Sequence, residues 1–159
     1  MKKKLVISLG SNLGNRYAYI RQAITHINRE LEGICQVAHF YETPPWGDEN
    51  QATFINTAAS IETSISLEQC LTVLQNIEKR MGRVKTKKWG PRSIDLDILF
   101  YGNETIKLNH LEVPHKHLHE RSFVLVPLCD ILPDFVHPIL NRPIADLYSE
   151  IDNDTTRIF

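Results

Sequence analysis

The sequence predicts an α+β fold in which an antiparallel β-sheet carries helices packed on it. Its 159 residues suit one compact domain, and the 42% of apolar residues are enough for one ordinary core. Between residues 4 and 101, apolar residues recur at strand and helix periods in the order β-α-β-β-α-β. No repeat, low-complexity tract or Gly/Ser-rich linker interrupts the chain. We therefore expect residues 1–159 to form a single domain.

The pattern begins with an apolar strand over residues 4–9, which ends at Gly10. A helix is expected over residues 15–31, where Asn12 or Asn15 can cap the start and Gly33 follows the end. Residues 34–43 and 54–62 are typical of strands. The segment between these two strands contains adjacent prolines, which cannot donate ladder hydrogen bonds, so we expect a loop there.

The second predicted helix begins at Ser66, which forms a capping box with Gln69, and Gly82 is well placed to end it. A strand over residues 94–101 completes the ferredoxin-like βαββαβ order, in which two helices lie on one face of the sheet. A C-terminal helical extension is expected beyond it, with helices over 119–131, despite Pro127, and over 143–150. The apolar stripe of the second helix consists of Leu67, Cys70, Leu71, Leu74, Ile77 and Met81.

Composition narrows the class of protein. The net charge of −1 argues against a general nucleic-acid binder, which is usually strongly basic. The isolated cysteines Cys35, Cys70 and Cys129 fit free thiols in a reducing compartment better than a disulfide framework. The N-terminus has no long apolar segment followed by a cleavage site, and no run reaches the length of a membrane span. We expect a cytoplasmic monomer that binds small molecules.

A basic stretch followed by two aspartates is the segment of the sequence that most clearly indicates a functional site. No acidic residue occurs between Lys79 and Ile94, whereas Asp95 and Asp97 follow at once on an apolar strand. Residues two apart on a strand share a face, with Leu96, Ile98 and Phe100 expected on the other. Mg²⁺ prefers such carboxylates together with substrate phosphates, so the pattern indicates a metal beside a phosphate-binding loop. A structural ion pair between the aspartates and Arg92 or a nearby lysine is the alternative. The basic residues are Lys79, Arg80, Arg83, Lys85, Lys87, Lys88 and Arg92.

The segment Lys88-Trp-Gly-Pro-Arg-Ser-Ile-Asp-Leu-Asp-Ile-Leu99 resembles the signature of the 6-hydroxymethyl-7,8-dihydropterin pyrophosphokinase family. The resemblance extends over nearly the whole chain. It implies transfer of the β,γ-diphosphate of ATP to the hydroxymethyl group of a reduced pterin in folate biosynthesis, with AMP as the other product. Further matching segments are Gly10-Ser-Asn-Leu-Gly14, Tyr41-Glu-Thr-Pro-Pro45, Phe54-Ile-Asn56, Gly82-Arg83, Val113-Pro-His115 and Arg121-Ser-Phe123.

The resemblance also implies a role for individual residues. Two Mg²⁺ ions are expected on Asp95 and Asp97, which are catalytic together with Arg83 and Arg92. Phe54 and Phe123 are the candidates to sandwich the flat pterin, and Asn56 can read its hydrogen-bonding edge. The expected ATP-binding residues are Gln75, Glu78, Lys85, Trp89, Arg92, Ile98, His115 and Arg121. The expected pterin-binding residues are Thr43, Pro44, Trp46, Phe54, Asn56, Trp89 and Phe123. Departures from the usual family pattern occur at Trp46, Phe54, Lys85, His110, Glu112 and Lys116.

Several alternatives remain at the level of the residues. Without the resemblance, Gln75 and Glu78 are typical of an exposed helix face, and single phenylalanines are typical of core packing. The glycine turn that starts at Gly10 lacks the Gly-Lys-Ser/Thr ending of a phosphate loop. Alternate histidines near His115 are weak support for zinc. The rival functions are an RNA-binding or small-ligand regulatory module and a metal-dependent phosphohydrolase. The aromatic motifs of an RNA-recognition domain are absent from the corresponding strands.

Overall fold

The computed structural model describes residues 1–44, 52–82, 93–152, 154 and 156–159. Within these residues, six strands form one antiparallel sheet in the order β5-β1-β4-β3-β8, and β2 also pairs with β4. The predicted α+β architecture is confirmed, and the fourth predicted strand pairs with the first. The strands are β1 Lys3–Ser11, β2 Gln36–Val37, β3 Tyr41–Thr43, β4 Phe54–Thr63, β5 Asp95–Tyr101 and β8 Arg157–Ile158.

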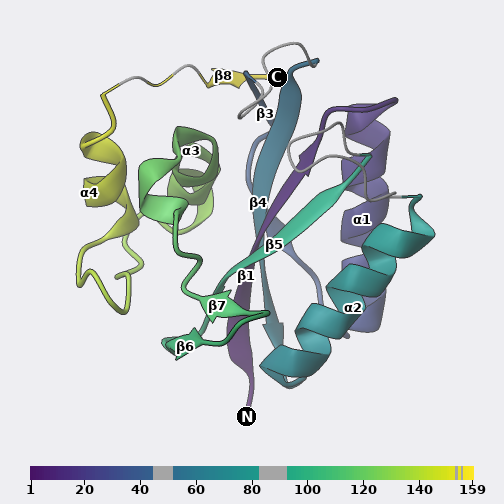
Figure 1. Ribbon diagram of the computed structural model, residues 1–159, viewed down its shortest axis with the longest axis horizontal. Helices are drawn as coiled ribbons and strands as arrows, with labels where there is room; N and C mark the ends of the chain where they lie inside the picture. Colours follow the sequence, from purple (N-terminus) through teal and green to yellow (C-terminus); the bar gives the residue numbers. More distant parts are fainter. Residues whose placement is uncertain (45–51, 83–92, 153, 155) are drawn as a thin grey trace.

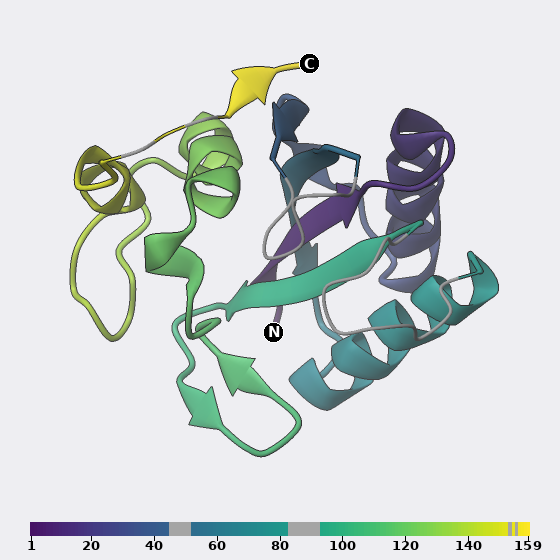
Figure 2. The ribbon, with the colours of Figure 1, turned by 45° about the horizontal axis from the view of Figure 1, so that its top comes forward.

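Helices cover both faces of the sheet. α1 (Arg16–Glu30) and α2 (Leu67–Arg80) pack on one face, while α3 (Ser122–Ile131) and α4 (Ile144–Ser149) lie on the other (Figures 1 and 2). A short hairpin of β6 (Ile106–Lys107) and β7 (Glu112–Val113), then a 3-10 helix (Leu118–Glu120), connects β5 to α3. The predicted C-terminal helices are thus present, and they form the second covering layer. No helix among the described ranges is long and apolar enough to cross a bilayer.

Local signals set the ends of α1 and α2 as predicted. The side chain of Asn15 accepts a hydrogen bond from the backbone N–H of Ala18, at 3.1 Å, and so caps α1. Ser66 caps α2 in the same way, accepting from the N–H of Gln69 at 3.3 Å. Gly82 has a φ of 82°, the left-handed conformation that commonly follows a helix.

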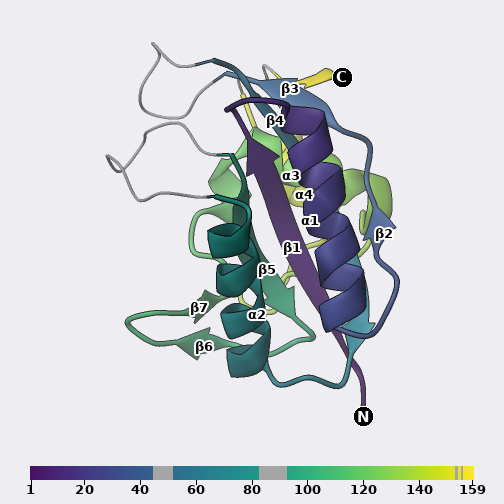
Figure 3. The same ribbon diagram turned by 90° about the vertical axis from the view of Figure 1, so that its right-hand side faces the viewer.

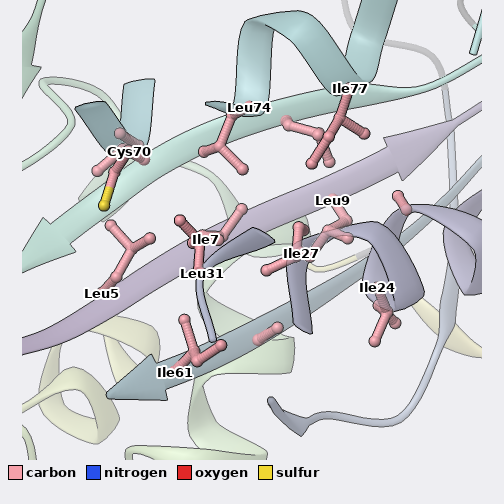
Figure 4. Packing of buried hydrophobic residues seen from close by; sticks show 14 of the residues in the cluster. Leu5, Ile7, Leu9, Ile24, Ile27, Leu31, Ile61, Cys70, Leu74 and Ile77 are labelled. Atoms are coloured by element: carbon pink, nitrogen blue, oxygen red, sulfur yellow. The ribbon is translucent and has the colours of Figure 1, made fainter. Parts of the chain in front are cut away.

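Side-chain alternation along β1 divides the core into two clusters. Leu5, Ile7 and Leu9 contact the layer of α1 and α2, where they pack with residues such as Ile27 and Leu74 (Figure 4). Intervening positions such as Val6 belong to the cluster under α3 and α4. Burial of one Leu or Ile side chain stabilises the fold by about 1.5–3 kcal/mol. Since both clusters contain such residues, packing on both faces stabilises the sheet. We call these two sides of the sheet the α1/α2 face and the α3/α4 face.

Two irregularities change which face later residues occupy. Val37 opposes Ala59 but Tyr41 opposes Asn56, so the segment between β2 and β3 holds one residue more than β4. The predicted continuous strand over 34–43 is therefore split into two. The extra residue reverses the alternation, and Thr43 faces α3/α4 instead of α1/α2.

A second irregularity lies in β5. Ile98 opposes Ile7 whereas Phe100 opposes Val6, so Leu99 is an additional residue in the strand. As a result, Phe100 faces α3/α4, where its ring centroid lies 4.8 Å from that of Phe135. The expectation that Phe100 shares a face with Leu96 and Ile98 is wrong, because a bulge inverts the period-two alternation.

Candidate functional site

Asp95 and Asp97 lie side by side on the α3/α4 face of β5. Leu96 and Ile98, between and after them, are buried in the opposite cluster, so the alternation expected at this point holds. Across the sheet, Asp97 opposes Ser8 and Asp95 opposes Gly10. Both aspartates are half-buried. Two carboxylates are therefore aligned on one face at the end of the sheet where β5 begins.

Arg121 places a positive charge near both carboxylates. Burial lowers the pKa of its guanidinium, and the negative charges of Asp97 and Asp95 act in the opposite direction. Arginine remains protonated in either case, so Arg121 is a fixed cation at this face. Its Cζ also lies 5.6 Å from the centroid of the Phe123 ring, on the first turn of α3. The start of α3 thus brings a cation and an aromatic ring to the aspartates.

Glu78 fixes the strand between the two aspartates. Its side chain is only 7% exposed, and its Oε2 accepts a hydrogen bond of 2.8 Å from the backbone N–H of Leu96. The interpretation of Gln75 and Glu78 as neighbours on an exposed helix face is therefore correct only for Gln75, which is exposed. Glu78 is buried because it follows Ile77 on the side of α2 that packs against β5.

A cavity of about 290 Å³ lies beside β5, between residues of α2 and of the β6–β7 hairpin. Figure 3 shows this hairpin next to α2. Leu96, Asp97 and Ile98 line it from β5, and His115 also lines it. The Nε2 of His110, one of the lining residues, lies 3.2 Å from a carboxylate oxygen of Glu68 on α2. The lining residues are Leu71, Leu96, Asp97, Ile98, Leu108, Asn109, His110, Leu111, Glu112, His115 and Lys116.

His115 is anchored by the bulge in β5. Its backbone N–H donates to the carbonyl of Leu99 at 3.1 Å. Burial, together with the positive charge of Arg121, lowers the pKa of its imidazole to about 4. His115 is therefore neutral at pH 7, so it offers a hydrogen-bonding ring and no positive charge.

Thr43 and Asn56 form a buried polar pair on the same face as Asp95. The Nδ2 of Asn56 donates to Thr43 Oγ1 at 2.7 Å. Gly10 lies between Asn56 and Asp95 in the sheet. A Cβ at this position would lie 2.6 Å from Asn56 Oδ1, so a larger residue would clash with the Asn56 amide. Phe54 is half-buried beside them. Gly10, Asp95 and the strand ends that carry Thr43 and Asn56 are thus adjacent, although they are far apart in the sequence.

The remaining predicted site residues divide into two groups. Pro44 is exposed at the end of β3. Arg83, Lys85, Trp89, Arg92 and Trp46 lie outside the described residues. The cavity also involves Leu71 and Leu111, which the sequence patterns assigned no site role. Leu71 belongs to the apolar stripe of α2. Only its position at the margin of that stripe could have indicated that it lines a cavity as well as the core.

Comparisons with known proteins find relatives that match most of this chain. The family model for 7,8-dihydro-6-hydroxymethylpterin-pyrophosphokinase matches residues 6–133. An Aquifex aeolicus 2-amino-4-hydroxy-6-hydroxymethyldihydropteridine pyrophosphokinase is 40% identical over 144 residues, which cover 91% of this chain and 89% of the relative. A Bacillus subtilis protein of the same name is 44% identical over 126 residues, with 79% and 75% coverage.

Solved structures support the fold. The Plasmodium falciparum HPPK-DHPS crystal structure with pterin and p-hydroxybenzoate matches with a TM-score of 0.73 at 18% identity. The match covers 94% of this chain but 43% of that longer chain. From the family match and the two bacterial relatives, this chain belongs to the 7,8-dihydro-6-hydroxymethylpterin-pyrophosphokinase family.

Proposed function

We propose that this chain, as a single-domain monomer, transfers the diphosphate of ATP to the hydroxymethyl group of 6-hydroxymethyl-7,8-dihydropterin and releases AMP. The observation that carries the proposal is the position of the two aspartates. Asp97 lines the cavity beside β5. Asp95 pairs across the sheet with Gly10 of β1, and Gly10 pairs on its other side with Asn56 of β4. The carboxylates therefore separate a space for the nucleotide from polar groups suited to the pterin.

The donor atoms at Asp95 and Asp97 fit magnesium. Mg²⁺ takes oxygen ligands and is usually bound by one or two carboxylates, substrate phosphates and water. In the described part of the chain, no group of three or more His, Cys, Asp or Glu side chains is arranged to hold a metal ion. A pair of carboxylates completed by phosphate oxygens suits this arrangement, and we propose two ions there. When bound, such ions neutralise phosphate charge and align the attacking and leaving oxygens.

The protein groups around the aspartates then position ATP. Arg121 offers a guanidinium whose planar fork can pair with two phosphate oxygens. His115 and Ile98 contact the nucleotide from the cavity wall, where the neutral imidazole donates or accepts a hydrogen bond. Arg83 and Arg92 are proposed to join them at the triphosphate. Positioning and charge neutralisation account for most catalysis in phosphoryl-type transfer, and no protein nucleophile is required.

The pterin is proposed to bind over Thr43, Asn56 and Phe54. A buried amide provides both a donor and an acceptor, which match the amide-like edge of a pterin. The half-buried rings of Phe54, on β4, and Phe123, on α3, offer flat apolar surfaces to the pterin ring. Substrates held on either side of Asp95 and Asp97 bring the hydroxymethyl oxygen toward the β-phosphate.

Mass analysis of a reaction with ATP, Mg²⁺ and 6-hydroxymethyl-7,8-dihydropterin tests this function. The expected products are AMP and a pterin that carries two added phosphates. Formation of ADP with a monophosphorylated pterin would refute diphosphate transfer. Release of diphosphate or phosphate to water, at the same rate with and without pterin, would identify a phosphohydrolase instead.

A further inference from the structure

We propose that Arg16, Glu42 and Thr53 act as positioning residues that hold the pterin-binding residues Thr43 and Phe54 from the opposite face of the sheet. The inference rests on the proposed pterin site. It assigns to that site three side chains that do not lie on the substrate face. We call these three residues the Arg16 cluster.

The contacts within the Arg16 cluster form a closed network. Nη1 of Arg16 donates to Glu42 Oε2 at 3.2 Å, to Thr53 Oγ1 at 2.9 Å and to the Thr53 carbonyl at 3.0 Å. The Thr53 hydroxyl in turn donates to Glu42 Oε2 at 2.8 Å. Each residue therefore contacts both others, and each comes from a different segment of the chain.

Strand alternation places this network behind the substrate face. Thr43 opposes Phe54 and Glu42 opposes Ile55. Ile55 belongs to the core under α1 and α2, whereas Thr43 bonds to Asn56 on the α3/α4 face. Glu42 and Thr53 precede Thr43 and Phe54 directly, so their side chains lie on the α1 side. One face of this strand pair carries the proposed pterin contacts, and the other face is tied to α1.

Arg16 is a fixed attachment point. It is the first residue of α1, directly after the Asn15 cap. Its Cζ lies 5.8 Å from the centroid of the Phe159 ring, which adds a cation–π contact. Hydrogen bonds from Thr53 and from Arg16 lower the pKa of Glu42, so its carboxylate is ionised at neutral pH. The cluster is thus complete under physiological conditions.

The energetic effect of the cluster should appear in pterin binding more than in folding. The Glu42 side chain is 43% exposed, and exposed ion pairs contribute little to stability. The two strand ends that it joins, however, carry Thr43 and Phe54. A displacement there moves both pterin contacts at once, whereas the cavity beside β5 is lined by other segments.

The test compares Glu42→Ala and Arg16→Lys with wild type, and Glu104→Ala serves as the matched control. Glu104 forms an ion pair of similar exposure with Lys3, away from the substrate face. Pterin affinity is measured by titration calorimetry with Mg²⁺ and a non-hydrolysable ATP analogue present. KM for each substrate, kcat and the midpoint of thermal unfolding are measured alongside.

For Glu42→Ala we expect a rise of about tenfold in the pterin Kd and KM, equivalent to about 1.4 kcal/mol. KM for ATP and the unfolding midpoint should stay near wild type. Arg16→Lys should have an intermediate effect, because lysine keeps the charge but its flexible ammonium loses the planar, pre-organised geometry of the guanidinium. The double variant should bind no more weakly than Glu42→Ala, since both changes break one network.

Wild-type pterin affinity in Glu42→Ala would overturn the inference, as would an equal rise in KM for both substrates or the same loss in Glu104→Ala. Asn56→Ala separates this outcome from failure of the proposed site, because Asn56 lies on the substrate face. If wild type binds pterin and Asn56→Ala does not, the site stands whatever the cluster variants show. If wild type binds no pterin, the site and the inference fail together.

Discussion

Replacement of Glu78 tests whether a buried carboxylate holds β5 in place between Asp95 and Asp97. Its Oε2 accepts from the Leu96 N–H at 2.8 Å, and both side chains are only 7% exposed. Within the described residues β5 ends the strand order, so this N–H is satisfied by a side chain of α2 and not by another strand. In Glu78→Ala the buried N–H loses this acceptor.

The expected loss follows from that geometry. A buried backbone group left without its partner costs about 1–3 kcal/mol, and more when the partner was charged. We therefore expect Glu78→Ala to lose about 3 kcal/mol of unfolding free energy, a fall of roughly 6–12 °C in the unfolding midpoint. Glu78→Gln keeps an acceptor oxygen and should lose about 1 kcal/mol. Because Leu96 separates Asp95 from Asp97, kcat should fall more in the alanine variant than in the glutamine variant.

Calorimetric unfolding and steady-state kinetics check this prediction. Gln75→Ala is the matched control, since Gln75 is exposed one turn earlier on α2 and its loss should leave the unfolding midpoint unchanged. Wild-type thermal stability in Glu78→Ala, with only KM for ATP raised, would refute the structural role. Glu78 would then act only as a nucleotide contact.

Three further predictions address the aspartates, His115 and Gly10. Asp97→Ala should keep the far-UV circular dichroism spectrum but lose about a hundredfold or more of kcat, a typical effect of removing a group that stabilises transition-state charge; full activity would exclude a metal role. His115 has a folded-state pKa of about 4 against an ordinary 6.5, so the unfolded chain binds more protons between these values. Stability should therefore fall as the pH drops from about 6.5 to about 4, by up to about 3 kcal/mol, and urea titrations of His115→Asn should lack that component. Gly10→Ala places a Cβ 2.6 Å from Asn56 Oδ1 and should weaken pterin binding in calorimetry, with little change in KM for ATP; unchanged pterin affinity would show that Asn56 can yield.

Much of the site could be predicted from the sequence where local patterns control it. The alternation of Asp95, Leu96 and Asp97 requires only that the segment be a strand, and the structure keeps it. The face of Thr43 could not be predicted in this way. An unbroken strand over 34–43 would have put Thr43 on the α1/α2 face, and the extra residue between β2 and β3 reverses it.

The charged residues show the same division. Arg121 lies 24 positions after Asp97 in sequence, and only the return of the chain into α3 brings its charge to the aspartates. Glu78 follows a helical pattern that is compatible with exposure, and its burial depends on how closely α2 packs against β5. The cavity requires the β6–β7 hairpin, whose strands are two residues each and too short to produce a periodic signal.

The sequence by itself determined the βαββαβ order of the core, the cap of α2, two candidate caps for α1, and the pairing of two aspartates on one strand face. These features depend on interactions between residues a few positions apart, which local periodicity records. Tertiary structure alone decided the two bulges, the burial of Glu78, the approach of Arg121 and the Arg16 cluster. These features arise from pairing and packing between distant segments, because the free energy of each contact depends on the position of its partner.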